Sequence, residues 1–268
     1  MKNVKKGNSM VTRITSTQNA QYKFFRALHR KKERMRHQVY MVEGIKSVRD
    51  AAAAGKDILA VLVSETFYQT EERFWDGADT YVIPDALFPA LCDTQSPQGI
   101  AAAVRMEQGR AFAPRENGLY IYCDHVADPG NLGTIIRTAD AAGMDGVLLS
   151  EGCVDLYSPK TVRASMGSFF HIPVWPDFTL EALLDMREAG YQLLSAALGG
   201  RTMLYTDADF TKPTVVILGN EANGVRRELQ TESDACVKIP MVGKAESLNV
   251  GIAGAVLMYE ALRQRKKQ

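Results

Sequence analysis

The second half of the chain alternates continuous apolar runs with helical patterns, and no other feature constrains its fold as strongly. Strands are expected in the apolar runs at 119–123, 146–149, 191–196, 214–218 and 235–239. Helices are expected at 132–142, 160–166, 180–189, 225–230 and 250–265. Apolar strands that alternate with helices form a mostly parallel sheet with helices on both faces. The sequence therefore predicts an α/β domain over 118–268, in which ligands bind at the carboxyl ends of the strands.

The first half of the chain predicts a smaller α/β domain. Its helices are expected at 18–39, at 44–54 and, opened by Asp85 as an N-cap, at 85–92. Its strands are expected at 58–64, 80–83 and 100–105. The segment that follows is rich in charge and holds Gly109 and Pro114, which is typical of a linker. The predicted organisation is a disordered tail over 1–9, the small domain over 10–107, a linker over 108–117 and the second domain over 118–268.

Positive charge is concentrated at the amino-terminal end. Residues 1–46 hold 12 lysines and arginines against 2 acidic residues, and the rest of the chain holds 20 against 29, so a net charge of +1 conceals the asymmetry. The basic residues of the helical segment are Arg26, Arg30, Lys31, Lys32, Arg34 and Arg36. Like charges repel unless a polyanion is near, so the segment is interpreted either as a phosphate-binding surface or as a solvated helix.

Several classes of protein are disfavoured. The longest apolar run, 250–259, is shorter than the roughly 20 residues of a membrane span, and the start lacks the apolar stretch of a signal peptide. We therefore expect a soluble, cytoplasmic protein with no membrane partner, which begins at Met1 or at Met10. The four cysteines lie far apart without a C-x-x-C pair, which favours reduced thiols over disulfides or a metal site.

The loop after 119–123 carries the features of an anion site. Asn131 is the expected N-cap of the following helix, and Arg137 lies on the polar side of that helix. Backbone N–H groups and the helix dipole favour an anion at such a terminus, and a nearby arginine adds charge. Taken alone, the loop is better explained by a capped helix that carries a surface arginine.

The loops after 214–218 and 235–239 add further polar groups. In GNEANG, Gly219 and Gly224 allow the backbone to approach a ligand closely, and Glu221 projects toward it, although a plain turn explains the glycines too. The chain has neither a P-loop nor the G-x-G-x-x-G of a dinucleotide-binding dehydrogenase. The third loop ends with Ser247 and Asn249 at the start of a helix. The small residues of this helix, Gly251, Ala253, Gly254 and Ala255, permit close packing on another helix or subunit.

Taken together, the segments NLGTIIRTADAAG, VVILGNEANG and IPMVGKAESLNV resemble, in order and spacing, the three motifs of the SpoU family of RNA 2′-O-ribose methyltransferases. This resemblance covers 118–268. The first half, from QYKFFRALHR through YMVEG to SPQGIAAAVR, resembles the ribosomal-protein-like substrate-binding domain found in many members.

The resemblance implies a fold and an activity. The second domain is expected to form a trefoil knot, to bind S-adenosylmethionine in that knot and to dimerise. The expected reaction is methylation of a ribose 2′-OH in structured RNA. We expect ribosomal RNA as the substrate, because an added RNA-binding domain suits a structured target that is gripped at a distance. The alternatives are the same reaction on transfer RNA, or a non-catalytic RNA-binding or ribosome assembly factor.

The resemblance also implies roles for individual residues. The cofactor positions are Gly219, Ile239 and Leu248, and the catalytic positions are Asn131, Arg137, Glu221, Ser247 and Asn249, with no metal. Because a guanidinium with a pKa above about 12 is a poor base, we expect Arg137 to grip a phosphate and stabilise the developing alkoxide. The proton then passes to that phosphate, to water or transiently to Arg137.

Two further features complete the comparison with the family. Lys160 and Arg163 are expected to line the approach of the RNA. The chain departs from the family pattern at Ala222-Asn223, where a glycine is frequent, and at Gly251, where a serine is frequent.

Overall fold

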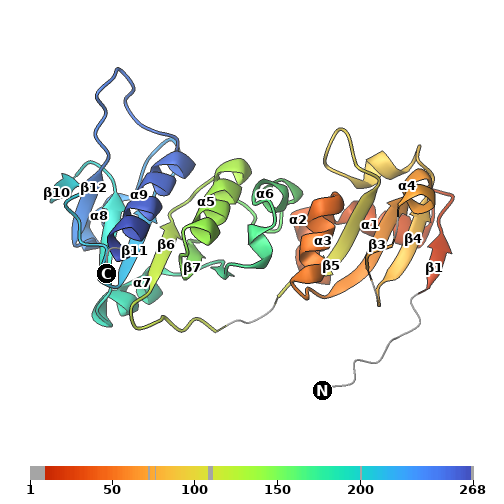
Figure 1. Cartoon of the computed structure of the whole chain (residues 1–268), viewed down its shortest axis with the longest axis horizontal. Helices are drawn as coiled ribbons and strands as arrows, with labels where there is room; N and C mark the ends of the chain where they lie inside the picture. The colour runs from red at the N-terminus through yellow and green to blue at the C-terminus, as the bar shows by residue number, and fades with distance from the viewer. Residues whose placement is uncertain (1–9, 72, 76, 108–110, 200, 267–268) are drawn as a thin grey trace. The chain divides into compact units, whose positions relative to one another are not determined.

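The computed structural model describes residues 10–71, 73–75, 77–107, 111–199 and 201–266 (Figure 1). It divides into two compact units, the first comprising Met1–Gln108 and Tyr157–Arg163 and the second Gly109–Leu156 and Ala164–Gln268. The tail expected over 1–9 and the first residues of the expected linker, 108–110, lie outside the described residues.

The described part of the first unit is built on a five-stranded mixed sheet of order β1-β4-β3-β5-β2. Its strands are β1 (Val11–Arg13), β2 (Val39–Glu43), β3 (Ile58–Ser64), β4 (Asp79–Ile83) and β5 (Ile100–Arg105). Its helices are α1 (Ala20–Ala27), α2 (Lys31–His37), α3 (Ile45–Ala53), α4 (Glu65–Thr70), the short 3₁₀ helix η1 (Phe88–Leu91) and most of α6 (Pro159–Ala164). The three predicted strands are confirmed, whereas β1, β2 and α4 were not predicted.

The single helix predicted over 18–39 is wrong, because the chain forms two helices and then a strand. Arg34 of α2 folds back, and its Nη1 donates hydrogen bonds of 2.7 Å to the carbonyl oxygens of Leu28 and His29, just beyond the end of α1. Gln38 then takes a left-handed conformation with φ 55°, which ends α2. The chain enters β2 at the next residue.

Asp85 is not the N-cap of a helix over 85–92, but it bonds to the first turn of α4, whose N-cap is Ser64. The Asp85 carboxylate accepts hydrogen bonds from the backbone N–H (3.2 Å) and the hydroxyl (2.7 Å) of Thr66, in the first turn of α4. The hydrogen bond from the Thr66 hydroxyl lowers the pKa of Asp85. The helix predicted over 85–92 shrinks to η1, which begins after Leu87 without a side-chain cap.

The second unit contains, in its described part, a seven-stranded parallel sheet of order β10-β12-β9-β11-β6-β7-β8. The strands are β6 (Leu119–Cys123), β7 (Gly146–Leu149), β8 (Val174–Trp175), β9 (Gln192–Ala196), β10 (Thr202–Leu204), β11 (Thr214–Leu218) and β12 (Ala235–Lys238). The helices are α5 (Pro129–Ala141), η2 (Ser168–Phe170), α7 (Leu180–Glu188), α8 (Arg227–Glu232) and α9 (Val250–Arg265). The predicted parallel α/β sheet is confirmed, and only the short edge strands β8 and β10 were missed.

Helix α9 packs against α5 and β11, and this packing uses the small residues of α9 (Figure 1). A Cβ atom added at Gly254 would lie 2.7 Å from Cδ1 of Leu218, and one at Gly251 would lie 3.1 Å from Cγ2 of Thr134. The frequent family serine would therefore crowd Thr134 at position 251. The glycines serve close packing within one chain, which brings the start of α9 beside the start of α5.

None of the helices in the described part of the chain has the length and apolar character of a membrane span. The same residues hold no group of three histidine, cysteine or acidic side chains that could bind a metal ion. All four cysteines are free thiols in the structure. Burial raises the pKa of Cys92 to about 12, so this thiol is protonated at neutral pH.

Candidate functional site

The first two motif loops leave the sheet at the same edge. Strands β6 and β11 are parallel neighbours in register from Leu119 beside Thr214 to Cys123 beside Leu218. Parallel strands present their carboxyl ends on one side, so the loops after Cys123 and Leu218 begin next to each other. The third motif loop leads into α9, which packs on α5.

Glu221 holds the loop after β6 in place. Its carboxylate accepts hydrogen bonds of 3.1 Å from the backbone N–H groups of Ala127 and Asp128, and one of 2.8 Å from Nδ2 of Asn131. Desolvation raises the pKa of Glu221, but the hydrogen bonds from Asn131, Ala127 and Asp128 outweigh it and leave the pKa below the ordinary value. Glu221 is therefore ionised at neutral pH and acts as an acceptor.

Asn131 is not the N-cap of α5. Asp128 takes that role, because its Oδ1 accepts a hydrogen bond of 2.9 Å from the backbone N–H of Asn131. Pro129 stands in the first helical position, where its fixed φ and missing N–H are tolerated, so the helix begins earlier than predicted. The Asn131 side chain, which lies in the first turn, is thereby available for other contacts.

These contacts join the three motifs into one polar chain. Asn131 donates to Glu221, and its Oδ1 accepts a hydrogen bond of 2.8 Å from Nδ2 of Asn249. Asn249 also caps α9, since its Oδ1 accepts from the N–H groups of Gly251 (2.9 Å) and Ile252 (3.3 Å). Three of the predicted site residues are thus in direct contact.

The turn that carries Glu221 requires its glycines. Asn220 and Gly224 exchange backbone hydrogen bonds of 3.0 and 2.9 Å, and Gly224 has a left-handed φ of 66°. Oδ1 of Asn220 accepts from the backbone N–H groups of Ala222 (2.9 Å) and Asn223 (3.2 Å). The Ala222-Asn223 departure therefore leaves a closed, hydrogen-bonded turn.

Gly219→Ala should lower the free energy of unfolding by about 1–3 kcal/mol, because overpacking forces the backbone to shift. An added Cβ would lie 2.1 Å from the backbone of Gly224 and Val225. Thermal melting of the variant checks this. Gly243→Ala is the control, since a Cβ there has no atom within 4 Å, and equal melting temperatures for the two variants would contradict the prediction.

A cavity of about 500 Å³ lies beside the third loop, at the ends of β9 and β12. Its walls include Ile239, Ser247 and Leu248 from that loop, and Leu257 from α9. Mostly apolar walls with a few polar groups are typical of a small-molecule site. Gly219, the third predicted cofactor residue, is not among the lining residues.

Arg137 is not joined to this network. Its side chain is exposed, and it forms no hydrogen bond or ion pair with any residue that the structure describes. It follows Asn131 by six residues, so the two side chains leave α5 about 120° apart. The structure therefore connects Asn131, Glu221 and Asn249 and places Ser247 at the cavity, whereas Arg137 forms no hydrogen bond or ion pair with any of them.

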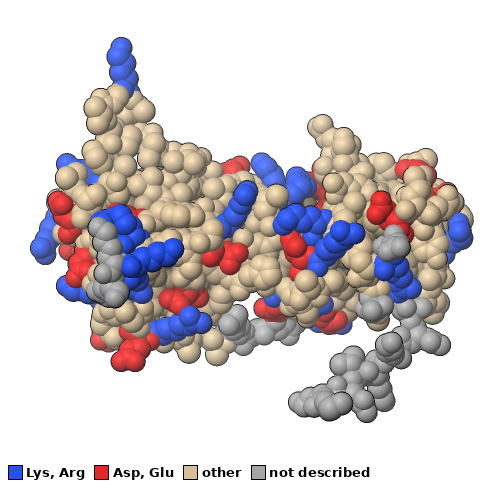
Figure 2. Space-filling model, in the orientation of Figure 1, with Lys and Arg blue, Asp and Glu red and all other residues tan. Residues whose placement is uncertain are grey.

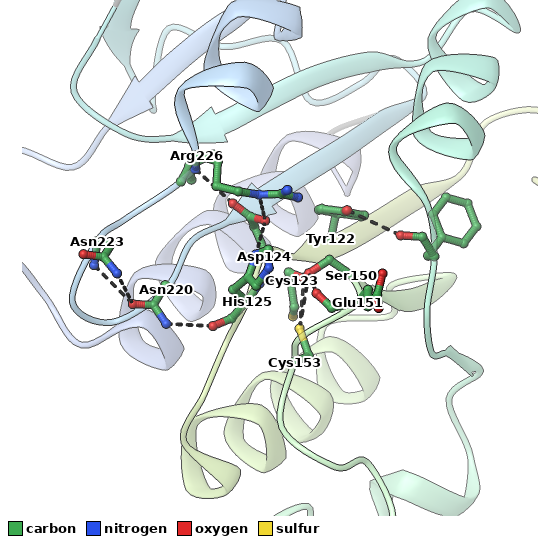
Figure 3. Close-up of polar contacts among 12 residues, drawn as sticks. Tyr122, Cys123, Asp124, His125, Ser150, Glu151, Cys153, Asn220, Asn223 and Arg226 are labelled. Carbon is green, nitrogen blue, oxygen red and sulfur yellow. Dashed lines mark hydrogen bonds and ion pairs between the residues drawn. The ribbon is translucent and has the colours of Figure 1, made fainter.

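Sequence reasoning missed a second polar cluster beside the polar chain (Figure 3). Asp124 is fully buried at the end of β6 and accepts from Nε (2.7 Å) and the backbone N–H (2.9 Å) of Arg226. Nδ1 of His125 lies 3.0 Å from the same carboxylate, and Nδ2 of Asn220 donates to the His125 carbonyl oxygen at 2.7 Å. One available signal was that Asp124 directly follows an apolar strand, because a buried carboxylate there needs a partner.

Arg163, which was expected to line the RNA approach, is engaged within the first unit. Its guanidinium forms ion pairs with Glu43 at 3.7 Å and Asp93 at 3.1 Å. The Glu43 side chain is nearly buried and also accepts hydrogen bonds from the backbone N–H groups of Asp93 and Thr94. Arg163 therefore serves an internal ion-pair cluster of that unit.

Comparison with known proteins gives matches over both halves of the chain. Residues 118–259 match the SpoU rRNA Methylase family, and residues 19–102 match the MRM3-like substrate binding domain. The 23S rRNA (guanosine(2553)-2′-O)-methyltransferase RlmP of Bacillus subtilis is 34% identical over 92% of this chain and 97% of its own. The 23S rRNA (uridine(2479)-2′-O)-methyltransferase of Streptomyces viridochromogenes is 32% identical over 94% and 92%.

Solved structures agree with these relatives. An AdoMet-bound rRNA methyltransferase from Sinorhizobium meliloti superposes with a TM-score of 0.84 at 35% identity, covering 94% of this chain and 98% of its own. The SpoU methyltransferase AviRb from Streptomyces viridochromogenes, in complex with AdoMet, gives 0.82 at 29% identity over 93% and 99%. With three motifs joined at one sheet edge and matches across both halves, the chain belongs to the SpoU rRNA methylase family.

Proposed function

We propose that this protein transfers a methyl group from S-adenosylmethionine to a ribose 2′-hydroxyl of ribosomal RNA. The observation that carries the proposal is the hydrogen-bonded chain Glu221–Asn131–Asn249, which links all three motifs. The 23S rRNA 2′-O-methyltransferases named above, which align over nearly the whole chain, support the same activity.

The cavity beside the third loop suits S-adenosylmethionine. Apolar walls at Ile239, Leu248 and Leu204 match the faces of an adenine ring, and Ser247 and Glu246 offer polar groups to its ribose and amino groups. Two solved structures of similar fold are described as AdoMet-bound. Bound there, the cofactor supplies an electrophilic methyl group on a sulfonium. In this proposal Gly219 acts through the turn that carries Glu221.

The residues of the chain then have to prepare the 2′-hydroxyl. A sulfonium leaves as a neutral thioether and needs no acid, so catalysis depends on holding the hydroxyl in line and assisting loss of its proton. Arg137, exposed and without a partner among the described residues, grips the adjacent phosphate and stabilises charge that develops on the oxygen. Glu221 fixes Asn131, while Asn249 and Ser247 orient the groups at the cavity.

The basic helices of the first unit support an RNA substrate. The side chains of Arg30 and Arg36 are each 72% exposed, and Figure 2 shows lysine and arginine side chains gathered over the region of α2 and α3. Glu33 pairs with Arg30 and Arg36, which leaves an excess of positive charge on this surface. Such a surface binds phosphates without sequence preference, with an affinity that falls steeply as salt rises.

The proposal includes a trefoil knot, a cytoplasmic location and a homodimer. Support for a dimer comes from α9, where Ile252 and Tyr259 are 51% and 50% exposed. They are seven residues apart and so share one face of the helix. A second copy packed there explains an Arg137 that bonds to no site residue of its own chain, because Arg137 then acts on the RNA at the second copy without lining the cofactor cavity.

Ile252→Asp should convert the proposed dimer to a monomer, because it places a charge in the centre of an apolar contact. Sedimentation velocity at micromolar concentration would record the change in mass. Aspartate is favourable in the first turn of a helix, so α9 should still form. Tyr68→Asp, on an exposed position of α4, is the control. An unchanged mass for Ile252→Asp would contradict this interface.

Methylation of total cellular RNA with labelled cofactor tests the proposed function. The expected result is label in ribosomal RNA at one nucleotide, and resistance of the adjacent bond to alkaline hydrolysis identifies the ribose 2′-oxygen. Label in transfer RNA alone would reassign the substrate. Absence of label, together with absence of S-adenosylmethionine binding in calorimetry, would instead indicate a non-catalytic RNA-binding factor.

A further inference from the structure

The guanidinium of Arg226 is anchored by the buried carboxylate of Asp124. Nε and the backbone N–H of Arg226 both donate to Asp124, at 2.7 and 2.9 Å (Figure 3). The side chain of Asp124 is fully buried, whereas that of Arg226 is 42% exposed. A carboxylate without contact to water requires a charged partner, so this ion pair fixes the guanidinium at the surface of the second unit.

The outer edge of the same guanidinium remains available. Within the described residues, neither Nη1 nor Nη2 of Arg226 donates a hydrogen bond. An arginine carries five N–H donors in a planar fork, and Asp124 uses only the one on Nε. Four donors are therefore without a partner among the described residues on a side chain that is 42% exposed, and a planar fork of this kind can bind a phosphate through two parallel hydrogen bonds.

The Arg226 guanidinium lies near the residues that are proposed to take part in the reaction. Arg226 follows the Glu221 turn by two residues, and Asp124 precedes the loop that Glu221 holds through Ala127 and Asp128. Arg226 is not among the residues that line the proposed cofactor cavity. An anion bound by Arg226 thus lies beside the polar chain and outside that cavity, where the RNA strand rather than the cofactor would pass.

We propose that Arg226 binds a backbone phosphate of the RNA substrate near the target nucleotide, and that Asp124 is the positioning residue that aims its guanidinium. The inference rests on the proposed function. A side chain that is already anchored loses less conformational entropy on binding than a free surface arginine does. The bidentate geometry also distinguishes this role from that of a general positive charge, which a lysine could supply.

Arg226→Gln compared with Arg227→Gln tests the proposal. Arg227 is the next residue and is exposed, and its guanidinium forms no hydrogen bond or ion pair with a described residue, so the two variants lose the same charge from neighbouring positions. For Arg226→Gln we expect the KM for RNA to rise about tenfold or more, since hydrogen bonds to charged groups are strong. The salt dependence of RNA affinity should lose about 0.7–0.9 of a unit of slope. The affinity for S-adenosylmethionine should not change.

Two further variants separate positioning from folding. Arg226→Lys retains the charge but not the fork, so the salt slope should stay while RNA affinity falls. Asp124→Asn keeps the guanidinium but weakens its anchor, so the KM for RNA should rise without loss of slope. Melting temperatures show whether Asp124→Asn or Arg226→Gln is unfolded. If either is, the RNA affinity of Arg226→Lys alone tests the proposal.

The outcomes that overturn the proposal are distinct from failure of the proposed function. Equal RNA affinity and slope for Arg226→Gln and Arg227→Gln would overturn it, as would wild-type RNA affinity in Arg226→Lys. A change confined to S-adenosylmethionine affinity would also overturn it and assign the fork to the cofactor carboxylate. If instead the wild-type protein methylated no RNA, the proposed function itself would fail.

Discussion

Arg137→Ala should reduce kcat for RNA methylation by about 10²–10³ while leaving the affinity for S-adenosylmethionine unchanged. The size follows from losing a charged donor that stabilises the charge developing on the oxygen in the transition state. The unchanged affinity follows from the structure, because Arg137 does not line the cavity that holds Ile239, Ser247 and Leu248. Single-turnover methylation and calorimetry with the cofactor measure the two quantities separately.

The comparison variants for Arg137 are Arg137→Lys and Arg227→Ala. Lysine should also be slow, since a point charge cannot reproduce a bidentate contact. Arg227→Ala removes an exposed arginine from the same unit and should methylate at close to the wild-type rate. Near-wild-type turnover by Arg137→Ala would remove Arg137 from the mechanism and leave the fixed polar chain to account for the activity.

Glu221→Gln should reduce turnover about 100-fold, which is the effect of misplacing reacting groups by about 1 Å. The Glu221 carboxylate accepts hydrogen bonds from Ala127, Asp128 and Asn131 at once. A glutamine has one acceptor oxygen, and its NH₂ group would face a backbone N–H donor. The variant therefore loosens the β6–α5 loop and removes the partner that orients Asn131. Single-turnover methylation at saturating RNA measures this loss.

The same substitution has a pH signature in stability. The folded protein lowers the pKa of Glu221 below its ordinary value of 4.5, so the ionised carboxylate stabilises the fold above that value. This contribution disappears as pH falls through the lowered folded-state pKa. Glu221→Gln should therefore melt below the wild type at pH 7, and the difference should narrow at acid pH.

Thermal melting over a pH series measures that signature. Glu228→Gln on α8 is the matched control, because Glu228 is exposed and its carboxylate forms no hydrogen bond or ion pair with a described residue. A difference between wild type and Glu221→Gln that stayed constant down to acid pH would exclude the carboxylate charge as its cause.

The sequence predicted those elements whose formation depends on neighbouring residues in the chain, and it missed those that depend on distant ones. Strands β6, β7 and β11 are continuous apolar runs buried on both faces, and their predicted bounds are the observed ones. Strands β8 and β10 hold two and three residues, too few for any pattern to emerge. Each is added at a sheet edge by pairing with a strand already in place.

The N-caps and the ends of the helices show more clearly what a local sequence pattern cannot predict. Asp128 and Asn131 are both good N-cap residues in the same loop. Only the structure of α5 shows that Pro129 is its first residue and that Asp128 is its N-cap. Asp85 was predicted to be the N-cap of a helix over 85–92, and this was wrong, because it bonds to the first turn of α4 instead. Its actual partner, Thr66, lies 19 residues away, and no local pattern records such a contact.

The same distinction applies to the candidate site, of which the sequence predicted one part and the tertiary structure decided the other. The order of strands and helices, together with the three motifs, was sufficient to place Glu221, Asn131 and Asn249 at one sheet edge, because parallel strands present their carboxyl ends together. Only the tertiary structure joined them, since the two hydrogen bonds span 90 and 118 residues. It alone also separated Arg137 from this network and buried Asp124 behind Arg226. Periodicity records which side of an element a residue occupies, whereas hydrogen-bond partners are decided by how the elements pack.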